Sequence, residues 1–381
     1  MERYSGQALP SNAHITVLGS CKVGNLVVTI PLLRCLRREY RDAVIDFWGS
    51  CITKDFEEAL CNEGLLNWRV SWDEAGDQAF AKLAEAAGER KEKVGPIHLL
   101  INCDGFNPVT KVLASWLRPC WVAGGSMNPT LRSTLAWGDQ RNQRFLEDQD
   151  WDSPEFIERY KGIFSSNYIA ELICRMAYQN PSEHDLASIE LPSLRPGFDV
   201  PEILIHCTTT RSAKVWPFKG WSEVLTWCEQ NQLTVGLVGA EPKRQMRDYH
   251  AGSGEEDLLN RFVASGTLQD LRGKTSLIQL AGACREAKAV VSVDAGPLHI
   301  AAASGTPTLA LVGNDACGVG ASPIRLWMPR AETMQRTIGS YTCSRCSDNH
   351  FRNDGCLETQ HHCMLAVGSE QVITWLKTVL G

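Results

Sequence analysis

The sequence contains no apolar run that approaches the roughly 18 residues needed to cross a bilayer as a helix. Its first residues also lack the charged segment followed by an apolar segment that a secretory signal would have. Positive charge is not in excess, since the net charge is −6. These absences predict a cytoplasmic protein with no transmembrane segment, and they exclude a surface that coats nucleic acid.

Internal repeats and low-complexity tracts are absent too, which argues against a solenoid or a mainly disordered chain. Hydrophobic residues make up 44% and charged residues 22% of the chain, as in ordinary globular proteins. A length of 381 residues exceeds the size at which one core usually stops growing. The composition therefore predicts two globular domains.

Cysteine, in contrast, is abundant, with 15 residues. Eleven of them are scattered singly through strand-like and helix-like segments, as small buried hydrophobic residues are. The last four form a separate pattern near the C-terminus, which is discussed below.

Short β-branched runs alternate with segments of helical periodicity along both halves of the chain. We expect strands at 14–18, 43–48, 97–103, 202–206, 233–238, 290–293 and 308–312, and helices at 26–40, 154–180, 220–231, 277–286 and 369–380, with loops or short helices over 128–152. Strands that alternate with helices are typical of parallel, doubly wound α/β sheets.

Four prolines and little apolar periodicity mark residues 181–201 as an interdomain linker. It would separate an N-terminal Rossmann-like domain, 1–180, from a second Rossmann-like domain, 202–342, which is followed by a cysteine-rich finger and a closing helix, 343–381. Ligands of such folds bind at the carboxyl ends of the strands. Two such sheets would face each other across a ligand cleft.

The stretch VVSVDAGPLHIAAASGTPTLALVG, residues 290–313, brackets a small-residue turn and a short helix between two apolar runs. Asp294 lies where the first strand ends, Gly296 lets a ligand approach the main chain, and Pro297 suits the first helical position. The amides from Ala295 to His299 would then form an anion site at an open helix start. The alternative is an ordinary turn in which Asp294 caps the helix.

Several motifs occur in one order: the loop GSCKVGN with a helix containing PLLRCLRR, a KVWP element, a strand that ends at a lone glycine, GKTSL, and DAGPLHIAAASGTP. In this order the chain resembles glycosyltransferase family 9, which contains the ADP-heptose heptosyltransferases. The resemblance covers nearly the whole chain and is firmest over 203–314. It implies the two-domain glycosyltransferase B fold, with the acceptor on the N-terminal half and the nucleotide sugar on the C-terminal half.

Sugar transfer from a nucleoside diphosphate requires a cation and an amide cradle for the departing phosphate. Lys214 in KVWP is the expected cation, and a solvated loop lysine is the alternative. Thr208, Thr209 and Thr210 offer hydroxyls at the preceding strand end, although such turns also occur without ligands. The diphosphate site would be completed by Asp294, Ala295, Gly296 and His299. Family members carry Ser or Thr at the position of Ala295. The alternative for His299 is a buried helix histidine that binds no ligand.

Ribose and base recognition are expected at the next strand ends. Gly239 and Glu241 could bring a carboxylate to the ribose hydroxyls, or Glu241 could face solvent. Thr275 and Ser276 resemble the adenine-side loop of the family. No DxD triplet lies in or directly before these loops, so a metal-free phosphate site is predicted.

The proton acceptor departs from the family pattern. Relatives commonly place an aspartate after the glycine of the first loop, where this chain has Asn25, and an amide cannot act as a base near neutral pH. Asp104, just beyond a strand, is the expected general base, with a turn-forming aspartate as the alternative. Lys22 and Asn25 would remain as acceptor-side contacts.

The four terminal cysteines, Cys343, Cys346, Cys356 and Cys363, have a spacing that suits tetrahedral Zn or Fe. His350, His361 and His362 are candidate substitutes for one thiolate. Because the nucleotide site is expected elsewhere, the metal would be structural, shaping a homo-oligomer contact or an acceptor-facing finger.

We therefore expect an inverting, metal-independent glycosyltransferase that moves a sugar from an ADP-sugar to a hydroxyl of a lipopolysaccharide core sugar or of a protein serine. The family resemblance implies that this sugar is heptose. Asn25 and Ala295 motivate a second hypothesis, a non-catalytic nucleotide-sugar-binding or assembly protein. A nucleotide-sugar epimerase of the same architecture is a third.

Overall fold

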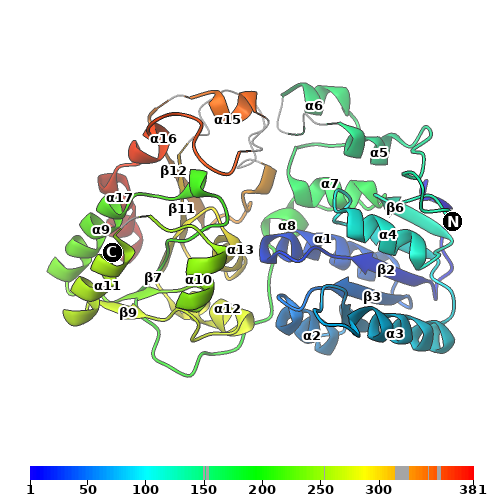
Figure 1. Cartoon of the computed structure of the whole chain (residues 1–381), viewed down its shortest axis with the longest axis horizontal. Coiled ribbons are helices and arrows are strands. Elements are labelled where there is room, and N and C mark those ends of the chain that lie inside the picture. Colours follow the sequence, from blue (N-terminus) through cyan, green and yellow to red (C-terminus); the bar gives the residue numbers. More distant parts are fainter. Residues whose placement is uncertain (149–150, 152–153, 253, 314–325, 342, 350–352) are drawn as a thin grey trace. The chain divides into compact units, whose positions relative to one another are not determined.

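The computed structural model describes residues 1–148, 151, 154–252, 254–313, 326–341, 343–349 and 353–381 (Figure 1). The chain divides into two compact units, Met1–Ile189 and Glu190–Gly381. Their boundary falls inside the proline-rich segment 181–201 that the sequence predicts as a linker. Within the described ranges, no helix combines the length and the apolar character needed to cross a membrane.

The first unit alternates strands and helices along nearly its whole length. Its elements are β1 (Glu2–Arg3), β2 (His14–Leu18), α1 (Val23–Glu39), β3 (Val44–Gly49), α2 (Lys54–Asn62), β4 (Trp68–Ser71), α3 (Ala79–Val94), β5 (Leu99–Asn102), α4 (Pro108–Trp116), β6 (Trp121–Gly124), α5 (Arg141–Arg144), η1 (Phe145–Glu147), α6 (Pro154–Arg159), α7 (Ile169–Met176) and α8 (Glu183–Ala187).

Its six strands form a parallel sheet in the order β1-β6-β5-β2-β3-β4. Residues of β2, β3 and β5 are buried almost throughout, which explains their nearly continuous apolar character. Leu83 of α3 and Leu113 of α4 pack into one cluster with Leu18, Leu100 and Val122 of the sheet. The chain order reverses between β2 and β5, so the loops after these two strands adjoin at the switch point where open α/β sheets bind ligands.

The second unit repeats the architecture. Its elements are β7 (Ile203–His206), η2 (Ser212–Lys214), α9 (Phe218–Gln230), β8 (Val235–Leu237), α10 (Pro242–Asp248), α11 (Glu255–Ala264), β9 (Leu268–Asp270), α12 (Leu277–Glu286), β10 (Ala289–Val293), α13 (Gly296–Ala303), β11 (Thr308–Val312), β12 (Met334–Ile338), α15 (Arg345–Asp348), α16 (His362–Leu365) and α17 (Ser369–Leu380).

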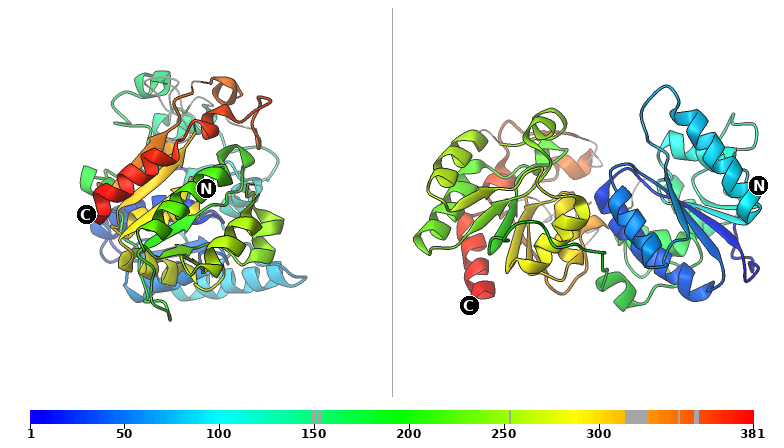
Figure 2. Two further views of the ribbon diagram at one scale, coloured as in Figure 1. Left: turned by 90° about the vertical axis from the view of Figure 1, so that its left-hand side faces the viewer. Right: turned by 90° about the horizontal axis from the view of Figure 1, so that it is seen from below.

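These six strands are also parallel, in the order β12-β11-β10-β7-β8-β9. The core combines residues of β7, β8, β10 and β11 with Trp221 of α9, Phe262 of α11 and Trp375 of α17. In Figures 1 and 2 the red helix α17 lies beside this sheet, next to α9. The predicted closing helix thus belongs to the core of the second unit, and the predicted α/β fold with two parallel Rossmann-like sheets is confirmed.

Some expected elements differ from those observed. The helix predicted over 154–180 is two helices, α6 and α7, because residues 160–168 form turns in which the Glu171 carboxylate accepts the backbone N–H groups of Ser165 and Ser166. The predicted linker contains α8, which begins with a capping box between Ser182 and Asp185. Strands β1, β4, β6, β9 and β12 are not among the predicted elements.

Candidate functional site

Two loops of the second unit adjoin at its switch point, between β7 and β10. His206 of β7 pairs with Ser292 of β10, so the residues that follow these two strands leave the sheet side by side. Thr209 Oγ1 donates to the carbonyl oxygen of Asp294 at 3.5 Å, which ties the two loops together. The structure therefore brings together most of the predicted diphosphate residues within one unit.

Lys214 and Asp294 form an ion pair at this point. The Lys214 Nζ lies 2.6 Å from Oδ2 of Asp294, and both side chains are largely screened from solvent. Burial opposes ionisation of Asp294, but the charge and hydrogen bond of Lys214, together with His299 and Arg211, lower the pKa of Asp294 below its ordinary value. Lys214 is thus held as a cation at the strand end, not extended into solvent as a loop lysine.

The start of α13 is open. Ala295 occupies the N-cap, Pro297 stands in the first turn, and no side chain caps the helix. The alternative in which Asp294 caps the helix is therefore wrong, because its carboxylate pairs with Lys214 instead. The first turn also contains no acidic residue. Since Pro297 has no N–H and the N–H of Leu298 donates to the carbonyl oxygen of Ala295, the Gly296 N–H is the donor of this turn that can receive an anion.

His299 lies in the first turns of α13 and is buried. Burial lowers the pKa of His299 to about 4, with Asp294 opposing and Lys214 reinforcing the shift, so the imidazole is neutral at pH 7. Among the described residues, its Nδ1 has no hydrogen-bond partner. A buried ring nitrogen without a partner, beside an open helix start, suits a polar ligand.

Two of the three threonines after β7 are buried, and they have different contacts. Thr208 Oγ1 accepts a hydrogen bond from Nε2 of Gln245 at 3.2 Å. Thr209 also exchanges backbone hydrogen bonds with His250, whereas Thr210 is exposed. Thr208 and Thr209 thus lie at the switch point, and Thr210 stands at its rim.

The predicted ribose and base loops follow β8 and β9. Gly239 has a φ of +153°, and a Cβ there would lie 2.3 Å from Nε2 of Gln245, so only glycine fits. Glu241 is the N-cap of α10, is exposed, as in the solvent-facing alternative, and caps no backbone N–H with its side chain. Ser276 is engaged in a capping box with Gln279, which leaves the half-buried Thr275 as the better ligand candidate of that pair.

In the first unit, the three predicted acceptor-side residues follow the two strands of its switch point. Lys22 and Asn25 come after β2, at the start of α1; Lys22 is exposed and Asn25 is half-buried. Asp104 follows β5, is partly exposed, and accepts a hydrogen bond from Nδ2 of Asn107 at 3.0 Å. Its backbone carbonyl also accepts from Asn107 and Thr110, so Asp104 does form a turn and keeps an accessible carboxylate.

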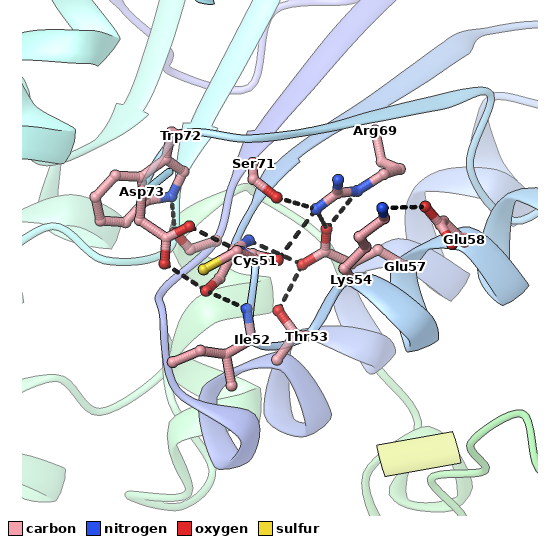
Figure 3. Close-up of polar contacts among 12 residues, drawn as sticks. Cys51, Ile52, Thr53, Lys54, Glu57, Glu58, Arg69, Ser71, Trp72 and Asp73 are labelled. Carbon is pink, nitrogen blue, oxygen red and sulfur yellow. Dashed lines mark hydrogen bonds and ion pairs between the residues drawn. The ribbon is translucent and has the colours of Figure 1, made fainter. Parts of the chain in front are cut away.

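Next to these loops lies a polar cluster that the sequence analysis did not identify (Figure 3). Buried Glu57 of α2 accepts two hydrogen bonds from Arg69 of β4, at 2.8 and 2.5 Å, and one from Thr53 at 2.5 Å. Burial raises the pKa of Glu57, although Arg69 and Thr53 oppose the shift. In the same cluster, the indole N–H of Trp72 donates to the carbonyl oxygen of Gly19, so this network supports the loop that precedes Lys22.

The cysteine-rich segment lies against the Lys214 loop. The backbone N–H of Ala213 donates to the carbonyl oxygen of Asp354 at 2.9 Å, and the Arg211 guanidinium donates to the carbonyl oxygen of Asn353. His250 also pairs with Asp354 at 3.3 Å. These contacts join the cysteine-rich segment to the residues just before Lys214, so the structure does not separate this segment from the predicted nucleotide site.

The four cysteines themselves are partly exposed thiols. Burial raises the pKa of Cys363 to about 11, and the thiols of Cys356, Cys346 and Cys343 act in the same direction, so the four lie within electrostatic reach of one another. Over the described ranges, however, no group of three or more His, Cys, Asp or Glu side chains is arranged to hold a metal ion. His350 lies outside the described residues, whereas His361 and His362 flank the start of α16.

The chain is similar to known glycosyltransferases in sequence and in fold. It is 26% identical over 311 residues to lipopolysaccharide heptosyltransferase 2 of Escherichia coli K12, covering 78% of this chain and 82% of that protein. A glycosyltransferase family 9 structure from Veillonella parvula superposes with a TM-score of 0.67 at 15% identity, covering 97% of both chains.

A second solved structure, the iron-containing dodecameric heptosyltransferase TibC of enterotoxigenic E. coli in complex with ADP-D-β-D-heptose, superposes with a TM-score of 0.59 at 13% identity, covering 98% of this chain and 77% of that one. At these identities the structural likenesses show the fold alone. The sequence profile of glycosyltransferase family 9 (heptosyltransferase) matches residues 146–347, more than half of the chain. The chain is therefore a glycosyltransferase and belongs to glycosyltransferase family 9, the heptosyltransferases.

Proposed function

We propose that this enzyme transfers heptose from ADP-heptose to a hydroxyl acceptor, with inversion at the anomeric carbon and without a metal ion at the phosphates. The Lys214–Asp294 pair beside the open start of α13 is the observation that carries the proposal. The names of the relatives support the donor, since one is a lipopolysaccharide heptosyltransferase and another was solved with ADP-heptose.

In this proposal the diphosphate lies between Lys214 and the Gly296 N–H at the start of α13. As the bond from the anomeric carbon to the β-phosphate oxygen breaks, negative charge grows on that phosphate, and the ammonium group and helix start stabilise it. Neutral His299 can donate one hydrogen bond without adding charge. Lys214 is released from Asp294 toward the phosphate, or it contacts both, because an ammonium group has three donors.

The acceptor hydroxyl attacks the anomeric carbon from the face opposite the leaving ADP, which inverts its configuration. The proton of that hydroxyl passes to a base, for which we propose the accessible carboxylate of Asp104. Lys22 and Asn25 would bind the acceptor near this carboxylate. The acceptor is a sugar of the lipopolysaccharide core, as the name of the E. coli relative indicates, or a serine of a protein.

ADP release from ADP-heptose tests the proposal. Purified enzyme with a lipopolysaccharide core acceptor, or with a serine-containing protein acceptor, should release ADP and form a heptosylated product of inverted configuration. The Lys214→Met variant should bind ADP weakly and form little ADP from ADP-heptose. If the wild type binds ADP tightly but turns over with neither acceptor, the second candidate function, a non-catalytic nucleotide-sugar-binding or assembly protein, replaces the first; Asn25 and Ala295 are the residues that favour it.

For the cysteine-rich segment we propose a structural iron or zinc ion held by Cys343, Cys346, Cys356 and Cys363. The four thiols fit such an ion in number and in chemistry, and TibC is named as iron-containing, but the described side chains are not arranged as a ligand set. No step of the reaction therefore depends on it. Elemental analysis of freshly purified protein tests the proposal, and light scattering tests self-association, which the dodecameric TibC suggests.

A further inference from the structure

Gln245 has a buried side-chain amide and belongs to the second unit. It is not among the predicted site residues and has no part in the proposed reaction. It is only 3% exposed, although it stands on α10, a short and otherwise polar helix. Its Nε2 donates to Oγ1 of Thr208 at 3.2 Å, and its Oε1 accepts from Nη1 of Arg272 at 3.3 Å. The amide thus bridges a buried guanidinium and a threonine of the switch point.

Arg272 fixes which end of the amide faces Thr208. A guanidinium has only donors, so the amide oxygen must face Arg272 and the NH₂ group must face Thr208. Arg272 is itself held by Asp270 through two hydrogen bonds of 2.8 and 2.9 Å, and by Glu255 at 3.0 Å. Since three contacts immobilise the guanidinium, the amide cannot flip without leaving a buried donor unpaired.

Gly239 leaves the space that the side-chain amide of Gln245 occupies. A side chain at this position would meet Nε2 of Gln245, and His206 stands on the same side of the glycine. His206 Nδ1 contacts the carbonyl oxygen of Val238 at 2.9 Å, which joins the ends of β7 and β8. The ends of β7 and β8 and the Gln245 amide therefore pack together next to Thr208.

We propose that Gln245 is a positioning residue for donor binding, which sets Thr208 as a hydrogen-bond donor to the phosphates of the ADP-sugar. A hydroxyl that accepts from an amide keeps its own proton for another acceptor. His206 and Ser292 pair in neighbouring strands, so the loop that carries Thr208 leaves the sheet beside Asp294, the partner of Lys214. In the proposal, the Thr208 proton is directed to a phosphate bound at this point. The inference rests on the proposed function, since it needs a donor diphosphate at this site.

Gln245→Glu tests the direction of the hydrogen bond. A carboxylate keeps the size of the amide and its contact with Arg272, but it can only accept, so it would take the Thr208 proton away from the phosphate. We expect the Kd for ADP, measured by titration calorimetry, to rise about tenfold or more, as for the loss of a charge-assisted hydrogen bond. Gln245→Met, which releases the hydroxyl without capturing its proton, should have a smaller effect.

A double-mutant cycle separates this effect from simple charge repulsion. Thr208→Val should weaken ADP binding about as much as Gln245→Glu, and the double variant should be no weaker than Thr208→Val alone. Gln269→Glu, at an exposed position of β9, is the matched control and should bind ADP as the wild type does. Adenosine, which lacks phosphates, should bind all these variants equally in a competition measurement by NMR.

Three results would overturn the inference: wild-type ADP affinity in both Gln245 variants, additive losses in the double variant, or an equal loss of adenosine binding. Urea unfolding of each variant shows whether it is folded. If Gln245→Glu does not fold, Gln245→Met takes its place in the double-mutant cycle with Thr208→Val. If the wild type itself binds no ADP, the proposed function fails, and the inference fails with it.

Discussion

Lys214 places its ammonium nitrogen 2.6 Å from the carboxylate of Asp294, between the loop after β7 and the end of β10. The pair holds a cation beside the open start of α13, so charge complementary to a diphosphate exists before any ligand arrives. Because the ammonium group is already held at the strand end, it needs only to turn part of its contact from Asp294 to the phosphate as the leaving group develops charge.

Lys214→Met should therefore lower kcat/KM for the ADP-sugar by about a hundredfold or more, in the range found when one transition-state donor is removed. Steady-state rates of ADP release measure this effect. Lys219→Met is the matched control, because the Lys219 side chain is 88% exposed on α9. Equal rates in Lys214→Met and the wild type would remove the ammonium group from the mechanism.

The buried imidazole of His299 predicts a dependence of stability on pH. Its pKa is about 4 in the folded protein and near 6.5 in the unfolded chain, so between these values only the unfolded state takes up the proton. Stability should thus fall as the pH falls, by about 2 kcal/mol between about pH 7.5 and about pH 5 for this group.

Urea unfolding of wild type and His299→Gln at these two pH values measures the contribution. His299→Gln should lose less stability on acidification than the wild type, while His184→Gln, at an exposed position of α8, should behave as the wild type. The lowered pKa of His206 affects all three proteins equally and cancels in the comparison. Identical pH dependence in His299→Gln and the wild type would contradict the prediction.

Asp104→Asn should reduce kcat by about 10²-fold to 10⁴-fold if Asp104 takes the acceptor proton, because general base catalysis contributes this much. ADP binding should change little, because ADP carries neither the acceptor hydroxyl nor the sugar at which Asp104 is proposed to act. Single-turnover rates and calorimetry together separate the two effects. Asn25→Asp is the companion variant: if it restores turnover to Asp104→Asn, the first loop retains the geometry for a base.

The polar cluster of Figure 3 allows a paired test of buried against exposed ion pairs. Arg69→Met leaves the fully buried Glu57 without its cation and should destabilise the protein by about 3 kcal/mol. Lys54→Met removes the exposed Lys54–Glu58 pair of the same helix and should cost less than about 0.5 kcal/mol. Chemical unfolding midpoints compare them, and Glu57→Gln combined with Arg69→Met should recover part of the larger loss.

Strands with strong β-branched patterns were predictable because burial on both faces requires continuous apolar runs, as in β2 and β10. The short strands at the sheet edges were not. β9 has only three residues, and two positions of the five-residue β12 are exposed, so neither leaves an apolar signal that can be read locally. Their pairing depends on neighbours that are distant in sequence.

The same contrast holds for the site. Asp294, Gly296 and Lys214 stand in motifs whose residue types follow from phosphate chemistry, and the structure brings them together. Gln245 stands in a polar helical segment where a glutamine is ordinarily exposed. Its burial depends on the missing side chain of Gly239 and on Arg272, which no local pattern connects to it.

The bond from Ala213 N–H to the carbonyl oxygen of Asp354 joins main chain to main chain. Alanine scanning would consequently leave this bond intact at both ends, although it would remove the side-chain contacts that Arg211 and His250 make with the same turn. A change that deletes the amide hydrogen, such as Ala213→Pro, is needed to measure what this main-chain bond contributes to the ADP binding proposed here.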